Sequence, residues 1–320
     1  MTSENKPAAR PRKKKHLPGA FLDLPPEACV YETSRAVVLP LPYEESVSYG
    51  GGTAKGPDAI IIASQQVELY NEDFDSEPAL QFGVHTLAEP EVFNSPAQRK
   101  NPAAVLAAIA DATSLHAKAG KFIVGLGGEH TVSYGIAKGL ASVRGAFALV
   151  HIDAHADLRE SYEDNPYSHA CVVRRIAELP ECEAILQLGI RSTSPDQVAF
   201  SRQHRPKAGL SPVIKTWTAD MMHEDDSWRN KLAKMVKGRK VFFTFDVDGL
   251  DPSIIPATGT PEPNGLTWRQ LMSAARIVAK NAYSVVAMDC VELAPAKGLH
   301  YADFAAARAV YNLMCIFLQK

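Results

Sequence analysis

Asp153, His155 and Asp157 follow one another at spacings of two residues, directly after the apolar run at residues 146–150. The run has the length and composition of a buried strand, in which side chains two residues apart point the same way. We therefore expect the two carboxylates and the imidazole to project together from the end of this strand. Such a cluster is unsuited to a hydrophobic core and well suited to holding a cation.

His130 closes the glycine-rich stretch Gly125-Leu-Gly-Gly-Glu-His130, which follows another apolar run. The stretch is not a dinucleotide-binding fingerprint, because His130 stands where the fingerprint needs its third glycine. Its glycines instead permit a tight turn that brings the imidazole to the edge of the sheet. Taken alone, His130 fits a structural histidine better than a ligand.

Asp246 and Asp248 are also two residues apart and follow the apolar stretch at residues 240–245. Together the motifs bring four carboxylates and two imidazoles to strand ends. Four buried carboxylates would repel one another strongly, whereas two divalent cations neutralise them. Ligation rich in oxygen, with some imidazole and no thiolate, suits Mn²⁺. The sequence thus predicts a site for two Mn²⁺ ions, with the candidate ligands His130, Asp153, His155, Asp157, Asp246 and Asp248.

Glu292, His169 and Glu163 are the candidates for contacting a substrate. Glu292 follows the strand predicted at residues 283–288 and is not needed as a ligand, so it is free to bind a cationic group or to form a salt bridge. His169 closes an acidic loop at residues 158–169 and could carry a proton or simply begin a helix. Glu163 belongs to this loop, whose acidity suits a substrate with a distal amine and almost equally a solvated surface.

Strands that alternate with helices must position these residues. The alternation indicates parallel βαβ units, hence an α/β fold with a mostly parallel sheet covered on both faces. Ligands of such sheets bind beyond the carboxyl ends of the strands. The predicted strands are 35–42, 80–84, 121–126, 146–152, 184–189, 213–217, 240–245 and 283–288, and the predicted helices are 55–70, 97–119, 131–140, 168–178, 195–203, 227–237, 267–281 and 301–318.

Composition narrows the class of protein. The 320 residues carry a formal net charge of −2, which gives no reason to expect nucleic acid as a partner. The five cysteines lack CxxC spacing, so we expect a cytoplasmic protein without disulfides or a thiolate zinc site. No apolar run is long enough to cross a membrane. We expect a flexible basic tail at residues 1–30 and one domain at residues 31–320. The basic cluster at residues 10–15 is a solvated segment, a targeting segment or a contact for an anionic surface.

These motifs, in this order, resemble those of the ureohydrolase family of arginases and agmatinases. The matching stretches are 127–130, 153–157, 168–170, 245–253, 256–263 and 291–295. The resemblance implies a three-layer α/β/α sandwich and a homo-oligomer, trimer or hexamer. It makes Glu292 the guanidinium-binding residue and His169 the proton carrier. It assigns one Mn²⁺ to His130, Asp153, Asp157 and Asp246 and the other to Asp153, His155, Asp246 and Asp248, so that Asp153 and Asp246 bridge the ions.

The loop at residues 158–169 is shorter and more acidic than the arginase loop that holds an amino-acid head group. The chain therefore resembles the agmatinase branch, which converts agmatine to putrescine and urea. N1-aminopropylagmatine, guanidinobutyrate and arginine are alternative substrates, although a carboxylate should be disfavoured by the acidic loop. A one-metal zinc deacetylase and a catalytically inactive metal-binding regulator are the competing functions. The paired acidic motifs disfavour the first, and the complete set of ligands disfavours the second.

Overall fold

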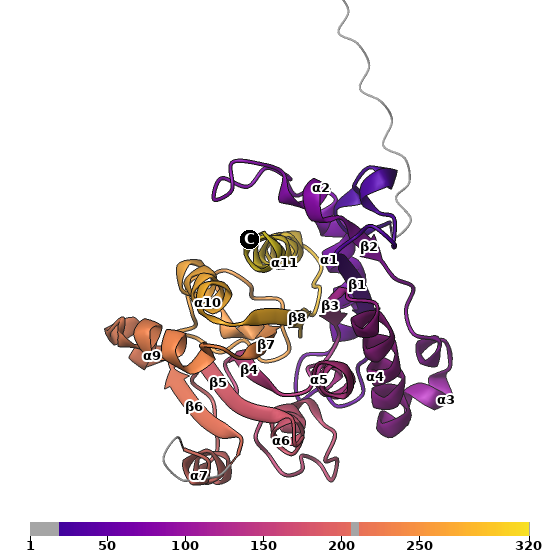
Figure 1. Cartoon of the computed structure of the whole chain (residues 1–320). Helices are drawn as coiled ribbons and strands as arrows, with labels where there is room; N and C mark the ends of the chain where they lie inside the picture. Colours follow the sequence, from indigo (N-terminus) through magenta and orange to yellow (C-terminus); the bar gives the residue numbers. More distant parts are fainter. Residues whose placement is uncertain (1–18, 206–210, 320) are drawn as a thin grey trace, which may run out of the picture.

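The fold is built on an eight-stranded sheet in which every neighbouring pair of strands is parallel (Figure 1). The computed structural model describes residues 19–205 and 211–319. The strands are β1 (Ala36–Leu41), β2 (Val84–Thr86), β3 (Phe122–Gly127), β4 (Phe147–Ile152), β5 (Cys182–Ile190), β6 (Val213–Thr218), β7 (Lys240–Asp246) and β8 (Ser284–Val291). Their order across the sheet is β2-β1-β3-β8-β7-β4-β5-β6. The predicted α/β fold with a mostly parallel sheet is confirmed.

Helices cover both faces of this sheet. One hydrophobic cluster joins the sheet to α1, α9, α10 and α11, and a second joins it to α4, α5 and α6 on the opposite face (Figure 1). The helices are α1 (Gly56–Ser64), α2 (Pro78–Phe82), α3 (Pro96–Arg99), α4 (Pro102–Lys118), α5 (Val132–Arg144), α6 (Val172–Ala177), α7 (Pro195–Gln203), α8 (Ala219–Glu224), α9 (Ser227–Val236), α10 (Trp268–Asn281) and α11 (His300–Leu318). Three layers result, as the resemblance implied.

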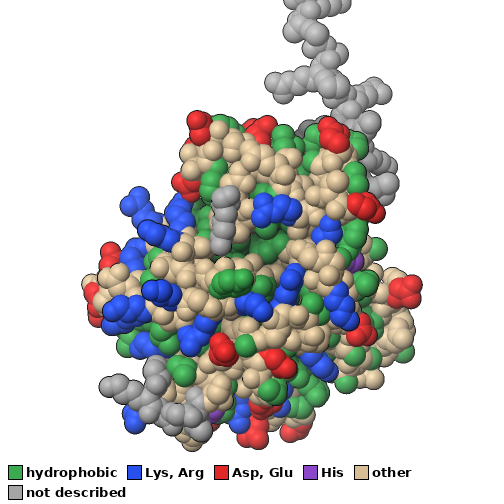
Figure 2. Space-filling view, in the orientation of Figure 1, with side chains coloured by type: hydrophobic (Ala, Val, Ile, Leu, Met, Phe, Trp, Pro, Cys, Tyr) green, Lys and Arg blue, Asp and Glu red, His purple; other side chains and the backbone are tan. Residues whose placement is uncertain are grey.

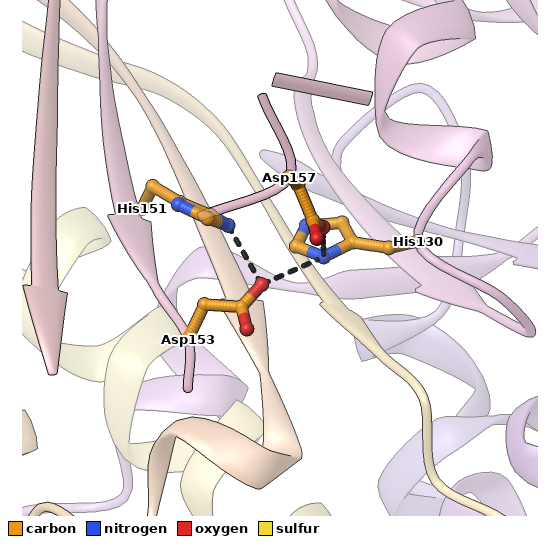
Figure 3. Close-up of side chains that lie close together, drawn as sticks. All are labelled: His130, His151, Asp153 and Asp157. Atoms are coloured by element: carbon orange, nitrogen blue, oxygen red, sulfur yellow. Dashed lines mark hydrogen bonds and ion pairs between the residues drawn. The ribbon is translucent and has the colours of Figure 1, made fainter. Parts of the chain in front are cut away.

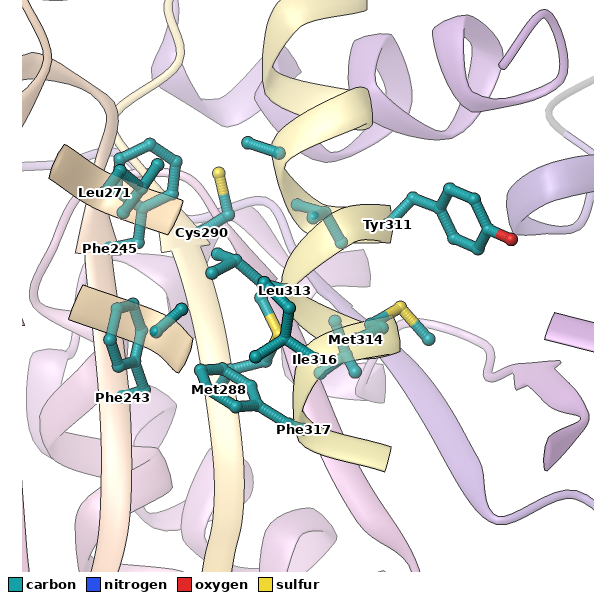
Figure 4. Close-up of a cluster of buried hydrophobic side chains, with 14 of the residues drawn as sticks. Phe243, Phe245, Leu271, Met288, Cys290, Tyr311, Leu313, Met314, Ile316 and Phe317 are labelled. Atoms are coloured by element: carbon teal, nitrogen blue, oxygen red, sulfur yellow. The ribbon is translucent and has the colours of Figure 1, made fainter. Parts of the chain in front are cut away.

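Aromatic and aliphatic side chains fill the space between β7, β8 and the helices α10 and α11 (Figure 4). Phe243 of β7 and Phe317 of α11 lie with their ring centroids 5.2 Å apart. Every residue of β3 and β4 is buried, because a parallel sheet is covered on both faces and its strands are mostly apolar. This packing fixes the central strands whose ends carry the polar motifs.

The helix predicted at residues 97–119 is two helices, α3 and α4. Pro102 opens α4 and disfavours a helical backbone at the residue before it. That residue, Asn101, has an extended conformation, and its side-chain oxygen accepts a hydrogen bond from the backbone N–H of Ala104 at 3.3 Å. Asn101 therefore caps a new helix. The Asn-Pro pair signals the start of this helix, although the sequence pattern predicted one continuous helix.

The strand predicted at residues 80–84 is wrong over most of its length. Residues 78–82 form the short helix α2, with Pro78 in its first turn, where a missing N–H costs little. Gly83, with a φ of +65°, ends the helix, and β2 begins only at Val84.

Helix α8 was not predicted, although Thr218 caps it by accepting a hydrogen bond from the backbone N–H of Met221.

The N-terminal segment is ordered earlier than the predicted boundary at residue 30. Phe21 and Leu22 are buried, and their backbone N–H groups donate to Thr86 Oγ1 at 2.9 Å and to Ser64 Oγ at 2.8 Å. These contacts attach residues 21 and 22 to the sheet and to α1. The basic cluster at residues 10–15 lies outside the described residues.

None of the helices in the described ranges combines the length and apolar character needed to cross a bilayer.

Replacing Phe317 by Ala should lower the free energy of unfolding by about 3–5 kcal/mol, because the change leaves a cavity beside Phe243 and Phe122. Phe304→Ala is the matched control on the same helix, since Phe304 is 41% exposed, and should cost less than about 1 kcal/mol. Denaturant titration followed by circular dichroism measures both. Equal losses for the two variants would show that this cluster does not stabilise the fold.

Candidate active site

The predicted metal ligands and Glu292 lie at the carboxyl ends of four strands that are adjacent in the sheet, β3, β8, β7 and β4. His130 follows β3, the segment 153–157 follows β4, Asp246 ends β7, and Glu292 follows β8. Because parallel strands end at the same edge, residues far apart in the sequence meet there. The predicted convergence of the four motifs is therefore seen in the structure.

His130 Nδ1 lies at the centre of a group of buried carboxylates. It is 3.1 Å from Asp153 Oδ2, and 3.3 Å from both Asp157 Oδ2 and Asp246 Oδ2. Figure 3 shows the imidazole of His130 and the carboxylates of Asp153 and Asp157, which come from the segment after β4, pointing toward one another. Asp157 has a left-handed backbone with a φ of +51°, which is a strained conformation of the kind found at functional sites.

His155 forms a second group beside the first. Its Nδ1 lies 3.0 Å from Asp248 Oδ2 and 3.6 Å from Asp153 Oδ1. Asp153 belongs to both groups of potential metal ligands, with one oxygen toward each imidazole. The arrangement fits two cation positions that share a carboxylate.

Backbone N–H groups orient three of the carboxylates. Asp246 Oδ1 accepts from the N–H of Asp248 at 2.9 Å, and Asp248 Oδ1 accepts from the N–H of Ala154 at 3.0 Å. Asp153 Oδ1 accepts from the N–H of His155 at 2.6 Å. Each hydrogen bond fixes one carboxylate oxygen and leaves the other directed at an imidazole, so the ligand atoms are held before any cation binds.

His151 lies within ligand distance of the first group, but both of its ring nitrogens have protein partners. Its Nε2 is 2.7 Å from Asp153 Oδ2 (Figure 3), and its Nδ1 is 3.2 Å from Gln187 Nε2. The amide of Gln187 donates, so Nδ1 accepts and the imidazole proton resides on Nε2, where it is donated to Asp153. In this geometry His151 supports the candidate ligand Asp153 through its Nε2.

The charges of the site are unbalanced without cations. Burial, followed by the charges of Asp248 and Asp153, raises the pKa of Asp246 well above its ordinary value. Burial opposes protonation of His130, but its carboxylate neighbours outweigh that effect and raise its pKa well above the ordinary range. Among the described residues, His130 Nδ1 has no partner in hydrogen-bonding geometry. Once it has lost its proton, this nitrogen offers a lone pair among buried carboxylate oxygens, a set of donors that fits a divalent cation.

Two connected cavities open onto these groups. A cavity of about 150 Å³ and a narrower one of about 30 Å³ share Ser48, His155, Asp157, His169 and Thr260 in their walls. The narrow cavity reaches Asp246, Asp248 and Glu292. The wider one is also lined by Arg159, Tyr162, Ala170, Ser192, Thr193 and Gln197. A small molecule in the cavities would contact both groups of candidate metal ligands. It would also contact Glu292 and His169, which were predicted to bind a substrate.

Glu292 lies in the wall of the narrow cavity and is only 8% exposed. Its Oε1 accepts a hydrogen bond from the backbone N–H of His130 at 2.6 Å, and its φ of +65° turns the chain sharply after β8. Burial, and then the nearby charge of Glu129, raises the pKa of Glu292 well above its ordinary value. A buried carboxylate of this kind gains most from a cationic partner.

His169 also lies in the cavity walls. It begins a 3₁₀ turn (His169–Cys171) that precedes α6, so the helix predicted at residues 168–178 is a turn followed by a shorter helix. Its Nε2 is 2.9 Å from Ser48 Oγ, and its Nδ1 is 3.3 Å from Ser46 Oγ. The two serines come from the segment after β1 and were not predicted as site residues, because isolated serines carry no motif.

Glu163 is not brought to the cavity. Its side chain is exposed and is absent from both cavity walls, while Tyr162 and Arg159 of the same loop line the wider cavity. The acidic residues Glu160 and Asp164 are exposed as well. The loop therefore presents a positive charge, not a negative one, to the cavity, and the argument that its acidity disfavours a substrate carboxylate loses its basis.

Comparisons with known proteins agree with this geometry. The family model described as "Arginase family" matches residues 34–316. The N(1)-aminopropylagmatine ureohydrolase of Synechocystis sp. is 34% identical over 291 residues, which cover 89% of each chain. The agmatinase of Bacillus anthracis is 34% identical over 268 residues, 83% of this chain and 85% of that one. The crystal structure of a putative agmatinase from Clostridium difficile superposes with a TM-score of 0.77 at 25% identity, covering 90% of this chain and 98% of that chain.

Asp153→Asn should reduce the bound divalent metal to one ion per chain or fewer, because Asp153 contributes to both groups and the amide removes its charge. Asp111→Asn, an exposed change on α4, is the control and should leave metal content unaltered. Inductively coupled plasma mass spectrometry on protein loaded with Mn²⁺ measures the stoichiometry. Two ions retained by Asp153→Asn would rule out Asp153 as a shared ligand.

Proposed function

The chain belongs to the arginase family and is a metal-dependent ureohydrolase, and on this basis we propose that it cleaves the guanidino C–N bond of agmatine to give urea and putrescine. The observation that carries the proposal is the position of Glu292, a buried carboxylate in the same narrow cavity as Asp246 and Asp248. A planar guanidinium cation suits this carboxylate, since it forms paired charge-assisted hydrogen bonds.

We propose Mn²⁺ for both cation positions. His130, Asp153, Asp157 and Asp246 would hold one ion, and Asp153, His155, Asp246 and Asp248 the other. The buried lone pair of His130 Nδ1 and the oxygen-rich surroundings without thiolate support this choice. When bound, the two ions would neutralise the carboxylates and lower the pKa of a water molecule enough for it to attack at neutral pH.

The protein side chains have separate tasks in this proposal. Glu292 orients the guanidinium so that its carbon faces the carboxylates of Asp246 and Asp248. The bound substrate is thereby held in a geometry in which it can react. His169, whose Nε2 lies beside the cavity wall at Ser48, delivers the proton that the departing amine nitrogen needs. The guanidino carbon–nitrogen bond of the substrate thus breaks between the carboxylate of Glu292, which holds the guanidinium, and His169, which donates the proton.

The wider cavity bears on the choice among guanidino substrates. Its volume of about 150 Å³ accommodates part of a short aliphatic chain, with the distal end toward Arg159 and Tyr162. Arg159 would repel a distal amine and attract a carboxylate, so guanidinobutyrate and arginine remain alternative substrates. The relatives named agmatinase support agmatine as the first choice.

N1-aminopropylagmatine is the second candidate substrate. The relative from Synechocystis sp. is named for this compound. Its additional cationic segment exceeds the wider cavity and would extend past Tyr162 to the exposed loop that carries Glu163. In this proposal Glu163 binds the far amine of the longer substrate and makes no contact with agmatine.

Glu292→Gln should lower kcat for urea release by about 10²–10³-fold, because the neutral amide loses the charge-assisted contacts to the guanidinium, while Mn²⁺ content stays unchanged. Glu178→Gln, an exposed change, is the control and should keep full activity. The assay is urea formation from agmatine, N1-aminopropylagmatine, guanidinobutyrate and arginine with Mn²⁺ present. Undiminished turnover by Glu292→Gln would contradict its assigned role, and a failure of every substrate would contradict the proposed function.

Glu163→Gln should raise KM for N1-aminopropylagmatine by roughly 2–5-fold and leave KM for agmatine unaltered, as expected for loss of one exposed ion pair. Glu160→Gln, an exposed charge in the same loop, is the control and should change neither constant. Initial rates over a range of concentrations of both substrates provide the comparison. Equal effects on the two substrates would mean that Glu163 does not bind the far amine.

A further inference from the structure

We infer that Glu129 and Ser46 are positioning residues that hold the imidazole of His169 in one tautomer, with the proton on Nδ1 and with Nε2 free to exchange protons at the cavity. The inference rests on the proposed role of His169 and adds two residues that act through it. The three side chains form a continuous chain of hydrogen bonds from the buried loop after β3 to the cavity wall.

Glu129 is fully buried, and its carboxylate is occupied by the segment after β1. Oε2 accepts from the backbone N–H groups of Glu45 at 2.8 Å and Ser46 at 2.7 Å, and Oε1 accepts from Ser46 Oγ at 2.9 Å. The loops approach this closely because Gly128 has no side chain: a Cβ there would lie 2.0 Å from the carbonyl oxygen of Tyr43. Because the hydroxyl of Ser46 is the donor in this contact, its proton is committed to Glu129.

Ser46 Oγ can then only accept hydrogen bonds from His169. It receives the backbone N–H of His169 at 3.1 Å and lies 3.3 Å from His169 Nδ1. With its own proton already donated, Ser46 requires Nδ1 to carry a hydrogen. Ser168 Oγ also lies 3.3 Å from Nδ1, and a hydroxyl donated from there would favour the opposite tautomer.

The other ring nitrogen is the one placed for chemistry. Nε2 lies 2.9 Å from Ser48 Oγ, and both Ser48 and His169 line the two cavities. In the Nδ1–H tautomer Nε2 accepts a proton, and the imidazolium then donates that proton from Nε2 toward the cavity. The ring of Tyr162 stands edge-on to the imidazole, and the two ring centroids are 5.9 Å apart. Glu129 thus determines which atom of His169 exchanges the proton.

Variants of Ser46 test the relay through kcat, KM and Mn²⁺ content. Ser46→Ala should lower kcat by about 10–100-fold with KM and metal content unchanged, as for loss of a residue that orients a functional group. Ser46→Thr keeps the hydroxyl and should restore most of the rate. Ser142→Ala, an exposed change on α5, is the matched control and should keep full activity. Ser168→Ala should retain most of the rate; a loss equal to that of Ser46→Ala would assign the tautomer to Ser168 and overturn the inference.

Glu129→Gln provides a second test that preserves shape. Its amide can donate to Ser46 Oγ, which releases the Ser46 hydroxyl to donate to Nδ1 and reverses the tautomer. We expect kcat to fall about as far as in Ser46→Ala, with Mn²⁺ content and thermal stability retained. Wild-type kcat in both Glu129→Gln and Ser46→Ala would overturn the relay.

A double-mutant cycle with His169→Ala separates the relay from the proposed function. If Ser46 acts through His169, Ser46→Ala should change the residual kcat of His169→Ala, measured at high enzyme concentration, by less than about 2-fold. A full additional loss would mean that Ser46 supports the fold and not the imidazole. Full activity in His169→Ala would refute the assigned proton carrier and the relay together, whereas an inactive His169→Ala beside a fully active Ser46→Ala would refute the relay alone.

Discussion

The repulsion among buried carboxylates at one edge of the sheet is the constraint on which this structure depends. Asp153, Asp157, Asp246 and Asp248 are all shielded from water, and burial together with the charges of Asp248 and Asp153 raises the pKa of Asp246. No arrangement of two imidazoles neutralises four such groups, so the site is complete only with added positive charge. Asp153 has one oxygen toward His130 and the other toward His155, so the two candidate cation positions share its carboxylate.

The protein meets this constraint by fixing the carboxylates with its own backbone. The hydrogen bonds from the N–H groups of Ala154, His155 and Asp248 hold three of them in place. The left-handed backbones of Asp157 and Glu292 are unfavourable for these residue types, yet they turn both side chains into the site. Rigidity of this kind reduces the reorganisation needed when a cation or a guanidinium binds.

The sequence predicted the central features because they depend on short-range periodicity. The spacing of two residues between Asp153, His155 and Asp157 predicted that these side chains share one face. The apolar run before them predicted the position of the strand. The errors arose where local signals competed: Pro102 begins a new helix within a helical pattern, and Pro78 begins a helix within an apolar run. Tertiary contacts that no periodicity encodes, such as Glu129 with Ser46 and the outward position of Glu163, became visible only in the structure.

The order of strands across the sheet also governs when the site can exist during synthesis. Strands β3 and β4 follow each other in the chain, but β8 and β7 lie between them in the sheet. A nascent chain that has reached Asp157 therefore has four of the six predicted ligands and no neighbouring strands to bring His130 against Asp153. The ribosome must release residues beyond Val291 before the sheet closes at its centre. A cation could therefore meet the complete set of candidate ligands only after the last strand of the sheet has been synthesised.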